Sequence, residues 1–123
     1  MRIQESGEMY LESIYTLSQR LEHVRSIDVC EDMGYSKPSV SRAVGLLKQG
    51  GFIEVDALGY ITLTDMGLAK AKKIYERHTV LSEFLISIGV SAEVAIEDAC
   101  RMEHTVSDTT LECIKKHLKS IKN

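Results

Sequence analysis

A thiol, a carboxylate and an imidazole follow one another closely in the last quarter of the chain. Cys100, Glu103 and His104 stand at positions i, i+3 and i+4. In an α-helix with about 3.6 residues per turn, these side chains fall within about 100° of one face. Sulfur, oxygen and nitrogen donors that converge in this way suit a transition metal better than solvent or a core. The spacing therefore predicts metal ligation.

Each donor also has an ordinary structural interpretation. Free cysteine is among the most buried residue types, so Cys100 could be a packed thiol. Glu103 and His104 could form a charged pair on an exposed face, and His78 could be a satisfied core histidine. Nearer the N-terminus, Met9 could be a core methionine and Glu12 a solvated acid. The combination favours a metal, because divalent ions need several donors from different elements.

The composition describes an ordinary globular protein. The 123 residues, 44% hydrophobic and 27% charged, suffice for one domain or two small lobes, which a homodimer would help to stabilise. There is no apolar run of the roughly 18 residues that span a bilayer and no signal peptide, which predicts a cytoplasmic protein without a membrane partner. Three widely spaced cysteines fit a reducing compartment, with Cys30 and Cys113 as core residues by default.

Charge is distributed unevenly along the sequence. Between Met33 and Ile53 the only charged residues are basic, whereas Glu83–Glu112 holds seven acids and one base, Arg101. A basic segment suits nucleic acid and a distant acidic segment suits a cation, so the pattern indicates two tasks in one chain.

Hydrophobic periodicity and turn residues predict six helices and a hairpin. The expected order is a helix over 5–21, a short helix over 26–33, a helix over 37–49, strands over 52–55 and 60–63, a long helix over 64–89, a fifth helix over 91–104 and a sixth from 107 onward. Apolar residues at helical spacing form one stripe on each of three helices. We expect this stripe to extend to Leu21 in the first helix, to Ile88 in the long helix and to Ile121 in the last helix. The first part of this order is a winged helix-turn-helix pattern.

The helix over 37–49 carries the features of a DNA recognition helix. Ser36 can cap it, and Pro38 falls in its first turn, where a missing N–H costs little. Arg42 could pair with guanine, and Lys37 and Lys48 suit phosphates. A solvated helix face is the alternative, but the hairpin that follows favours DNA binding. The residues predicted to contact DNA are Ser36, Lys37, Pro38, Ser39, Ser41, Arg42 and Lys48.

Several motifs occur in order over nearly the whole chain. They are Glu8-Met9-Tyr10-Leu11, Ser36-Lys37-Pro38-Ser39-Val40-Ser41, Arg77-His78, Glu97-Asp98-Ala99-Cys100-Arg101-Met102-Glu103-His104 and Ser107-Asp108. Together they resemble the diphtheria toxin repressor and manganese transport regulator (DtxR/MntR) family of metal-dependent transcriptional repressors. The resemblance implies a mainly α fold. A winged helix-turn-helix domain over 1–63 with a β-hairpin wing would precede a helical metal-binding and dimerisation domain over 64–123. Because the chain ends after the sixth helix, we expect a short form without the SH3-like third domain.

The resemblance also implies the metal ligands. A primary site would consist of Met9, Cys100, Glu103 and His104. A second site would include His78 and Glu12, with Glu103 placed to bridge. Two positions depart from the iron-type second site, because Ser82 stands where it has glutamate and Ile96 where it has histidine.

The ligand set combines the two branches of the family. The manganese branch has aspartate at the position of Met9 and glutamate at that of Cys100, whereas Glu12 and His78 are of the manganese type. Thiolate and thioether favour Fe(II) over Mn(II), so we expect Fe(II) as cofactor, with Mn(II) as the alternative that Glu12 and His78 keep open. Zn(II), Co(II) or Ni(II) should be able to substitute in vitro. Arg42 replaces a glutamine of the diphtheria repressor, which leaves the operator sequence open.

The implied function is repression of metal-uptake genes by a homodimer on a palindromic operator in double-stranded DNA. A metal-independent repressor that senses oxidants through Cys100 is the alternative, although the nearby Glu103 should make the thiol less reactive. An enzyme is not expected, because the sequence has no His-Glu-x-x-His motif, nucleophile elbow or phosphate loop.

Overall fold

The computed structural model describes residues 5–122 and divides the chain into two compact units, residues up to Lys72 and residues from Lys73 onward. Within the described range the chain forms six helices and one two-stranded hairpin, in the predicted order. The mainly helical fold class, with its winged helix-turn-helix beginning, is therefore confirmed.

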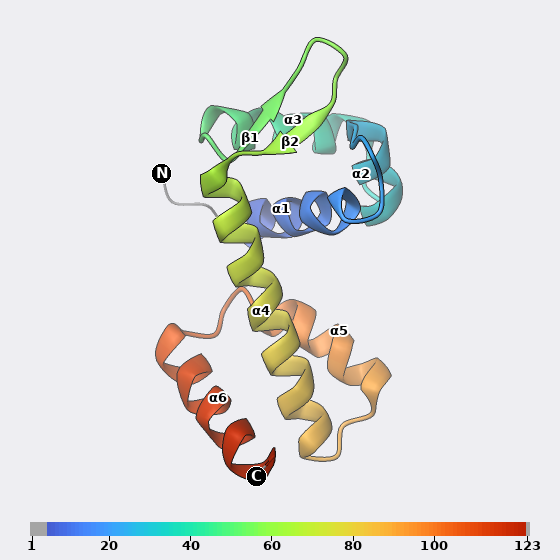
Figure 1. Cartoon of the computed structure of the whole chain (residues 1–123). Helices are drawn as coiled ribbons and strands as arrows, with labels where there is room; N and C mark the ends of the chain where they lie inside the picture. Colours follow the sequence, from blue (N-terminus) through green and yellow to red (C-terminus); the bar gives the residue numbers. More distant parts are fainter. Residues whose placement is uncertain (1–4, 123) are drawn as a thin grey trace. The chain divides into compact units, whose positions relative to one another are not determined.

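Three helices and the hairpin build the first unit (Figure 1). The helices are α1 (Glu5–Ser18), α2 (Ser26–Met33) and α3 (Lys37–Gln49). Leu11 and Ile14 of α1 are fully buried, as are Val29 of α2 and Val40 of α3. These side chains stand at helical spacing on the inward faces, so the core of the unit follows from hydrophobic periodicity.

Local signals fix the two ends of the turn between α2 and α3. Gly34 ends α2 with a left-handed backbone (φ 70°), a conformation that glycine adopts without steric cost. The Ser36 hydroxyl accepts a hydrogen bond from the Ser39 N–H at 3.4 Å, and Pro38 lies in the first turn of α3. Both the capping residue and the bounds of α3 agree with the prediction.

The hairpin pairs β1 (Ile53–Val55) with β2 (Ile61–Leu63) in antiparallel register, Ile53 opposite Leu63. Its loop is closed by Asp56, whose Oδ1 accepts the backbone N–H groups of Leu58 and Tyr60, each at 2.9 Å. An isolated bridge from Val24 to Ile61 ties the hairpin to the segment before α2. These contacts hold the wing against the helices.

The start of α4 (Asp65–Ser87) lies close to the backbone of Phe52, the residue just before β1. The Thr64 hydroxyl accepts a hydrogen bond from the Gly67 N–H at 3.1 Å and donates one to the Gly51 carbonyl at 2.6 Å. A Cβ atom on Gly67 would overlap the carbonyl oxygen of Phe52. Gly67 therefore permits a close backbone approach that any other residue would block.

The second unit consists of the rest of α4, α5 (Ala92–Met102) and α6 (Asp108–Lys122), which flank α4 (Figure 1). The core of this unit contains one buried side chain from each helix, Leu81 of α4, Ala99 of α5 and Leu111 of α6, which pack together. Ser91 caps α5 as predicted, accepting the N–H of Val94 at 3.4 Å. This small core sets the spacing between the helices that carry the candidate ligands.

Several expectations about helix ends and cysteines are wrong. α1 ends at Ser18 and α4 ends at Ser87. The last residues of the three predicted apolar stripes are exposed, with relative accessibilities of 37% for Leu21, 60% for Ile88 and 52% for Ile121. The apolar pattern in the sequence extends beyond the point where a neighbouring element packs against the helix. Hydrophobic periodicity therefore overestimates how much of each helix is buried. Cys113 is exposed rather than in the core, and Cys30 is partly buried.

Candidate metal centre

The helix that carries the predicted ligands is shorter than expected. α5 ends at Met102, and Glu103 caps it with a helical backbone whose N–H donates to the Ala99 carbonyl at 2.9 Å. Glu103 therefore keeps its helical position relative to Cys100, whereas His104 lies in the turn beyond. The prediction of one continuous helix face is correct for Cys100 and Glu103 and wrong for His104.

Three of the predicted donors meet within the second unit. The ligand atoms of His78 from α4 and of Cys100 and Glu103 from the end of α5 all lie within 4.8 Å of one another. Ligands of one ion lie roughly 3–4.5 Å apart, because each metal–ligand bond is about 2.0–2.3 Å long. The spacing and the mixture of nitrogen, sulfur and oxygen donors both fit one divalent transition metal.

The carboxylate of Glu103 lies between two imidazoles. Its Oε2 is 3.0 Å from Nδ1 of His78, and its Oε1 is 3.2 Å from Nε2 of His104. The side chain of Glu103 is 0% exposed, that of His104 1% and that of His78 21%. A buried carboxylate is costly unless it is hydrogen-bonded, paired or coordinated, so a histidine pair and a cation both suit this position.

Cys100 is exposed, which contradicts the interpretation as a packed thiol. The next residue, Arg101, forms an ion pair with Asp98 at 2.8 Å on the surface of α5. A side-chain hydrogen bond to Asp98 raises the pKa of Arg101, so its guanidinium remains charged. Because Arg101 is committed to Asp98, it is a suitable control position close to the cluster.

Met9 and Glu12 lie on α1 in the first unit, and both are partly buried. The other four predicted ligands, His78, Cys100, Glu103 and His104, belong to the second unit. The involvement of Met9 and Glu12 in the same centre stays a prediction.

The predicted DNA-reading face of α3 is exposed as a recognition helix requires. Val40, Val44 and Leu47 are buried on its inward side. All residues that were predicted to contact DNA are exposed, namely Ser36, Lys37, Pro38, Ser39, Ser41, Arg42 and Lys48. The hydroxyl of Ser36 donates to that of Ser39 at 2.9 Å, so the cap occupies part of this polar surface.

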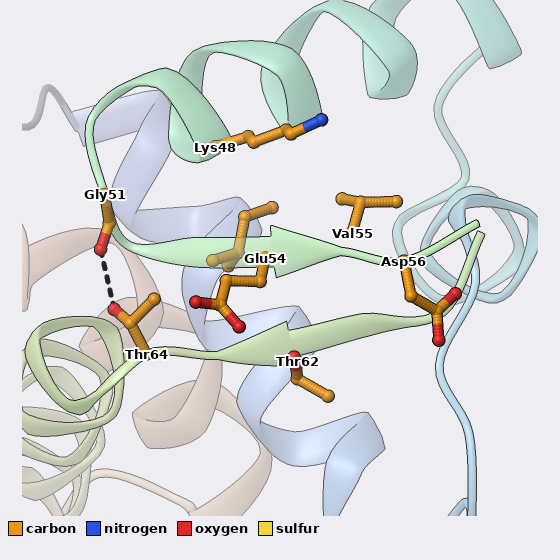
Figure 2. Close-up of a pocket in the computed structure, with 8 residues that line it drawn as sticks. Lys48, Gly51, Glu54, Val55, Asp56, Thr62 and Thr64 are labelled. Atoms are coloured by element: carbon orange, nitrogen blue, oxygen red, sulfur yellow. Dashed lines mark hydrogen bonds between the residues drawn. The ribbon is translucent and has the colours of Figure 1, made fainter. Parts of the chain in front are cut away.

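A groove of about 550 Å³ lies between the end of α3 and the hairpin. Figure 2 shows Lys48 of α3 above the hairpin, with Glu54 on β1, Thr62 on β2 and Asp56 just beyond the end of β1. Asp56 is used in closing the hairpin loop. With one base and two acids along its lining, the groove does not select a ligand of either charge.

Both halves of the chain match family models. Residues 2–58 match the iron dependent repressor, N-terminal DNA binding domain, and residues 64–123 match the iron dependent repressor, metal binding and dimerisation domain. No helix in the described part of the chain has the length and apolar character needed to cross a membrane.

Individual relatives agree with these matches. The chain is 35% identical over 106 residues to the transcriptional regulator MntR of Escherichia coli O6:H1, covering 86% of this chain and 68% of the relative. It is 30% identical over 105 residues to the iron-dependent repressor IdeR of Mycobacterium bovis, covering 85% and 46%. Among solved structures, the manganese regulator SloR aligns with a TM-score of 0.82 at 32% identity, covering 97% of this chain and 55% of that one.

The metal-dependent transcriptional regulator MtsR aligns with a TM-score of 0.85 at 31% identity, covering 92% of this chain and 53% of that one, so the chain spans about half the length of SloR and of MtsR. The matches favour a metal-dependent regulator over an oxidant sensor. The family comprises transcriptional repressors and not enzymes. By its two matching domains and its fold, the chain belongs to the DtxR/MntR family of metal-dependent transcriptional regulators.

Proposed function

We propose that this protein is a metal-dependent, DNA-binding transcriptional repressor of metal-uptake genes. The observation that carries the proposal is the convergence of His78, Cys100 and Glu103 in a chain whose other unit exposes the polar face of α3, the second helix of a helix-turn-helix. A nitrogen, sulfur and oxygen donor set has little use in a purely structural core. The cytoplasm is the compartment we propose for it.

The proposed ligands are His78, Cys100, Glu103 and His104, completed by Met9 and Glu12 of the first unit. Bound there, a divalent cation supplies positive charge and fixes the direction of its ligands. Glu103 has a particular role, because its two oxygens already lie beside His78 and His104. Besides acting as a ligand, the carboxylate would orient the two imidazoles through these contacts, the role that carboxylate partners of metal-binding histidines have.

We propose Fe(II) as the physiological metal, with Mn(II) as the competing possibility. The support is the thiol of Cys100 within the cluster and the thioether of Met9, because soft sulfur donors favour iron over manganese. Zn(II), Co(II) and Ni(II) should bind in vitro, since the general affinity order places them above Mn(II).

We propose a DNA-binding domain over 1–63 and a metal-binding and dimerisation domain over 64–123, with a homodimer as the active form. A twofold dimer presents two copies of α3, which can read palindromic half-sites about one helical turn (~34 Å) apart in double-stranded DNA. Arg42 is the proposed base-reading residue, and Lys37 and Lys48 are proposed to contact phosphates. Metal and operator then strengthen each other's binding reciprocally.

The test is anaerobic binding of metal and DNA by the full chain. The DNA probe is a duplex selected from a random pool in the presence of Fe(II), and binding is followed by fluorescence anisotropy with Fe(II), Mn(II) or a chelator. The proposal expects binding that the chelator abolishes, and half-maximal activation at lower free Fe(II) than Mn(II). DNA binding that persists without metal would contradict the regulatory mechanism, and a lower requirement for Mn(II) would overturn the choice of iron.

Cys100→Ala serves as the variant and Cys113→Ala as its matched control, because Cys113 is exposed on α6 outside the cluster. Cys100→Ala should lose bound metal and activated DNA binding together. If it keeps both at the level of the control, the proposed centre is wrong.

A further inference from the structure

Arg77 spans the connection between α5 and α6 and contacts both of its ends. Its Nε donates a hydrogen bond to the carbonyl oxygen of Glu103 at 2.8 Å, and its Nη1 lies 2.8 Å from Oδ1 of Asp108. The Arg77 side chain is only 12% exposed. A guanidinium carries several donors in a rigid plane, so one side chain can hold two acceptors at a fixed separation.

The contact with Glu103 contributes to positioning more than the contact with Asp108 does. The Glu103 carbonyl is at the end of α5, where the last carbonyl groups have no partner within the helix. Arg77 supplies that partner from α4. Asp108 is 72% exposed and also lies 3.9 Å from Lys73, so solvent screens its ion pair and a second base shares it.

Two consecutive residues of α4 therefore hold Glu103, the residue that caps α5. Arg77 binds the backbone of Glu103, and His78 lies 3.0 Å from its carboxylate. The adjacent His104 follows Glu103 in the chain and contacts the other carboxylate oxygen at 3.2 Å. Any movement of the Glu103 backbone would thus displace the carboxylate and both imidazoles relative to one another.

We propose that Arg77 is a positioning residue for the metal centre, which it serves by fixing the backbone of Glu103 without contacting the ion. The inference rests on the proposed function for the ligands, but no motif spacing assigns this role to Arg77. It predicts that loss of Arg77 alters metal affinity and coordination while the helices of the second unit remain folded. An ordinary structural ion pair would affect unfolding alone.

Three variants and a control separate these cases. Arg77→Lys keeps the charge but loses the planar pair of donors, Arg77→Met removes both contacts, and Asp108→Asn weakens only the exposed one. The control is Arg101→Met, which removes an ion pair of the same length on the surface of α5. Co(II) is the probe, because its visible and thiolate charge-transfer bands report the number and type of its ligands.

We expect Arg77→Lys and Arg77→Met to weaken Co(II) affinity by about 10- to 100-fold, the range for residues that orient ligands, and to change the Co(II) spectrum. Asp108→Asn and Arg101→Met should change the affinity by less than about threefold and leave the spectrum intact. Hydrogen exchange of the metal-free protein should show faster exchange over residues 103–107 in the two Arg77 variants only.

Unchanged affinity and spectrum in folded Arg77→Lys would overturn the role of Arg77. If Arg77→Met fails to fold, Arg77→Lys still decides the question, because it retains the charge and most of the volume. A wild-type protein that takes up no Co(II) would instead contradict the proposed function itself.

Discussion

Oε2 of Glu103 lies 3.0 Å from Nδ1 of His78, which joins the end of α5 to the middle of α4. The two residues are 25 positions apart in the sequence, and the apolar contact among Leu81, Ala99 and Leu111 brings their helices together. A polar contact this well buried at the side of a small core is specific to one packing of the helices. The candidate metal centre therefore depends on the same packing that stabilises the second unit.

Replacing Glu103 by glutamine should abolish tight metal binding. The amide removes the negative charge and can accept through one atom only, so the two imidazoles lose their common partner. We expect a decrease in Mn(II) or Fe(II) affinity of at least about 100-fold, measured by competition with a fluorescent chelator. Glu97→Gln, at an exposed position on α5, should bind metal like the wild type. Equal affinities of the two variants would exclude Glu103 as a ligand.

Replacing Cys100 by serine should change the preference among metals. A hydroxyl is a harder and weaker donor than a thiolate, so Fe(II) affinity should fall more than Mn(II) affinity, by about tenfold in the ratio. Anaerobic competition titrations with both ions give that ratio directly, and Cys113→Ser is the control. A parallel decrease for both metals would show that the thiol does not determine selectivity.

Replacing Gly67 by alanine should destabilise the first unit strongly. The added Cβ would overlap the carbonyl oxygen of Phe52, so α4 or the backbone at Phe52 must move. We expect a loss of about 2–4 kcal/mol in the free energy of unfolding, as for other steric insertions into close-packed sites. Urea unfolding followed by circular dichroism measures it.

Gly45→Ala is the matched control for that variant, since it lies in α3 with no atom within 4 Å of the added Cβ. Alanine has the higher helix propensity, so this variant should be more stable than the wild type by about 0.5–1 kcal/mol. A Gly67→Ala protein as stable as the wild type would contradict the close approach between Gly67 and Phe52.

Replacing Arg42 and Lys48 singly by alanine should weaken DNA binding in two different ways. Arg42 lies on the exposed face of α3, where a bidentate contact to guanine would contribute about 1–3 kcal/mol and select one base. Lys48, in the last turn of the same helix, should contribute through a phosphate. Arg42→Ala should therefore bind mutated operators as well as the selected one, and Lys48→Ala should weaken binding to all of them similarly.

The salt dependence of binding distinguishes the two residues further. Loss of one phosphate contact reduces the slope of log affinity against log salt concentration by about one. We expect this change for Lys48→Ala, measured by anisotropy between low and moderate salt. Identical slopes for Lys48→Ala and wild type would contradict the proposed phosphate contact.

The sequence predicted the winged helix-turn-helix because its signals are local. Gly34, Ser36 and Pro38 specify the turn and the start of α3 through backbone conformation and capping, which need no distant partner. The inward faces of α3 and α6 follow from the 3.6-residue period. The prediction that the apolar stripes are buried to their ends was wrong at Leu21, Ile88 and Ile121. Burial at a helix end depends on whether another element extends far enough to cover it.

For the candidate metal centre, the sequence by itself determined the donor types and the helical spacing of Cys100 and Glu103. Only the tertiary structure decided that His78 lies against Glu103, that His104 leaves the helix, and that Arg77 holds the Glu103 backbone. Residue spacing encodes neighbours within one helix, whereas contacts between α4 and α5 depend on how side chains pack around Leu81 and Ala99.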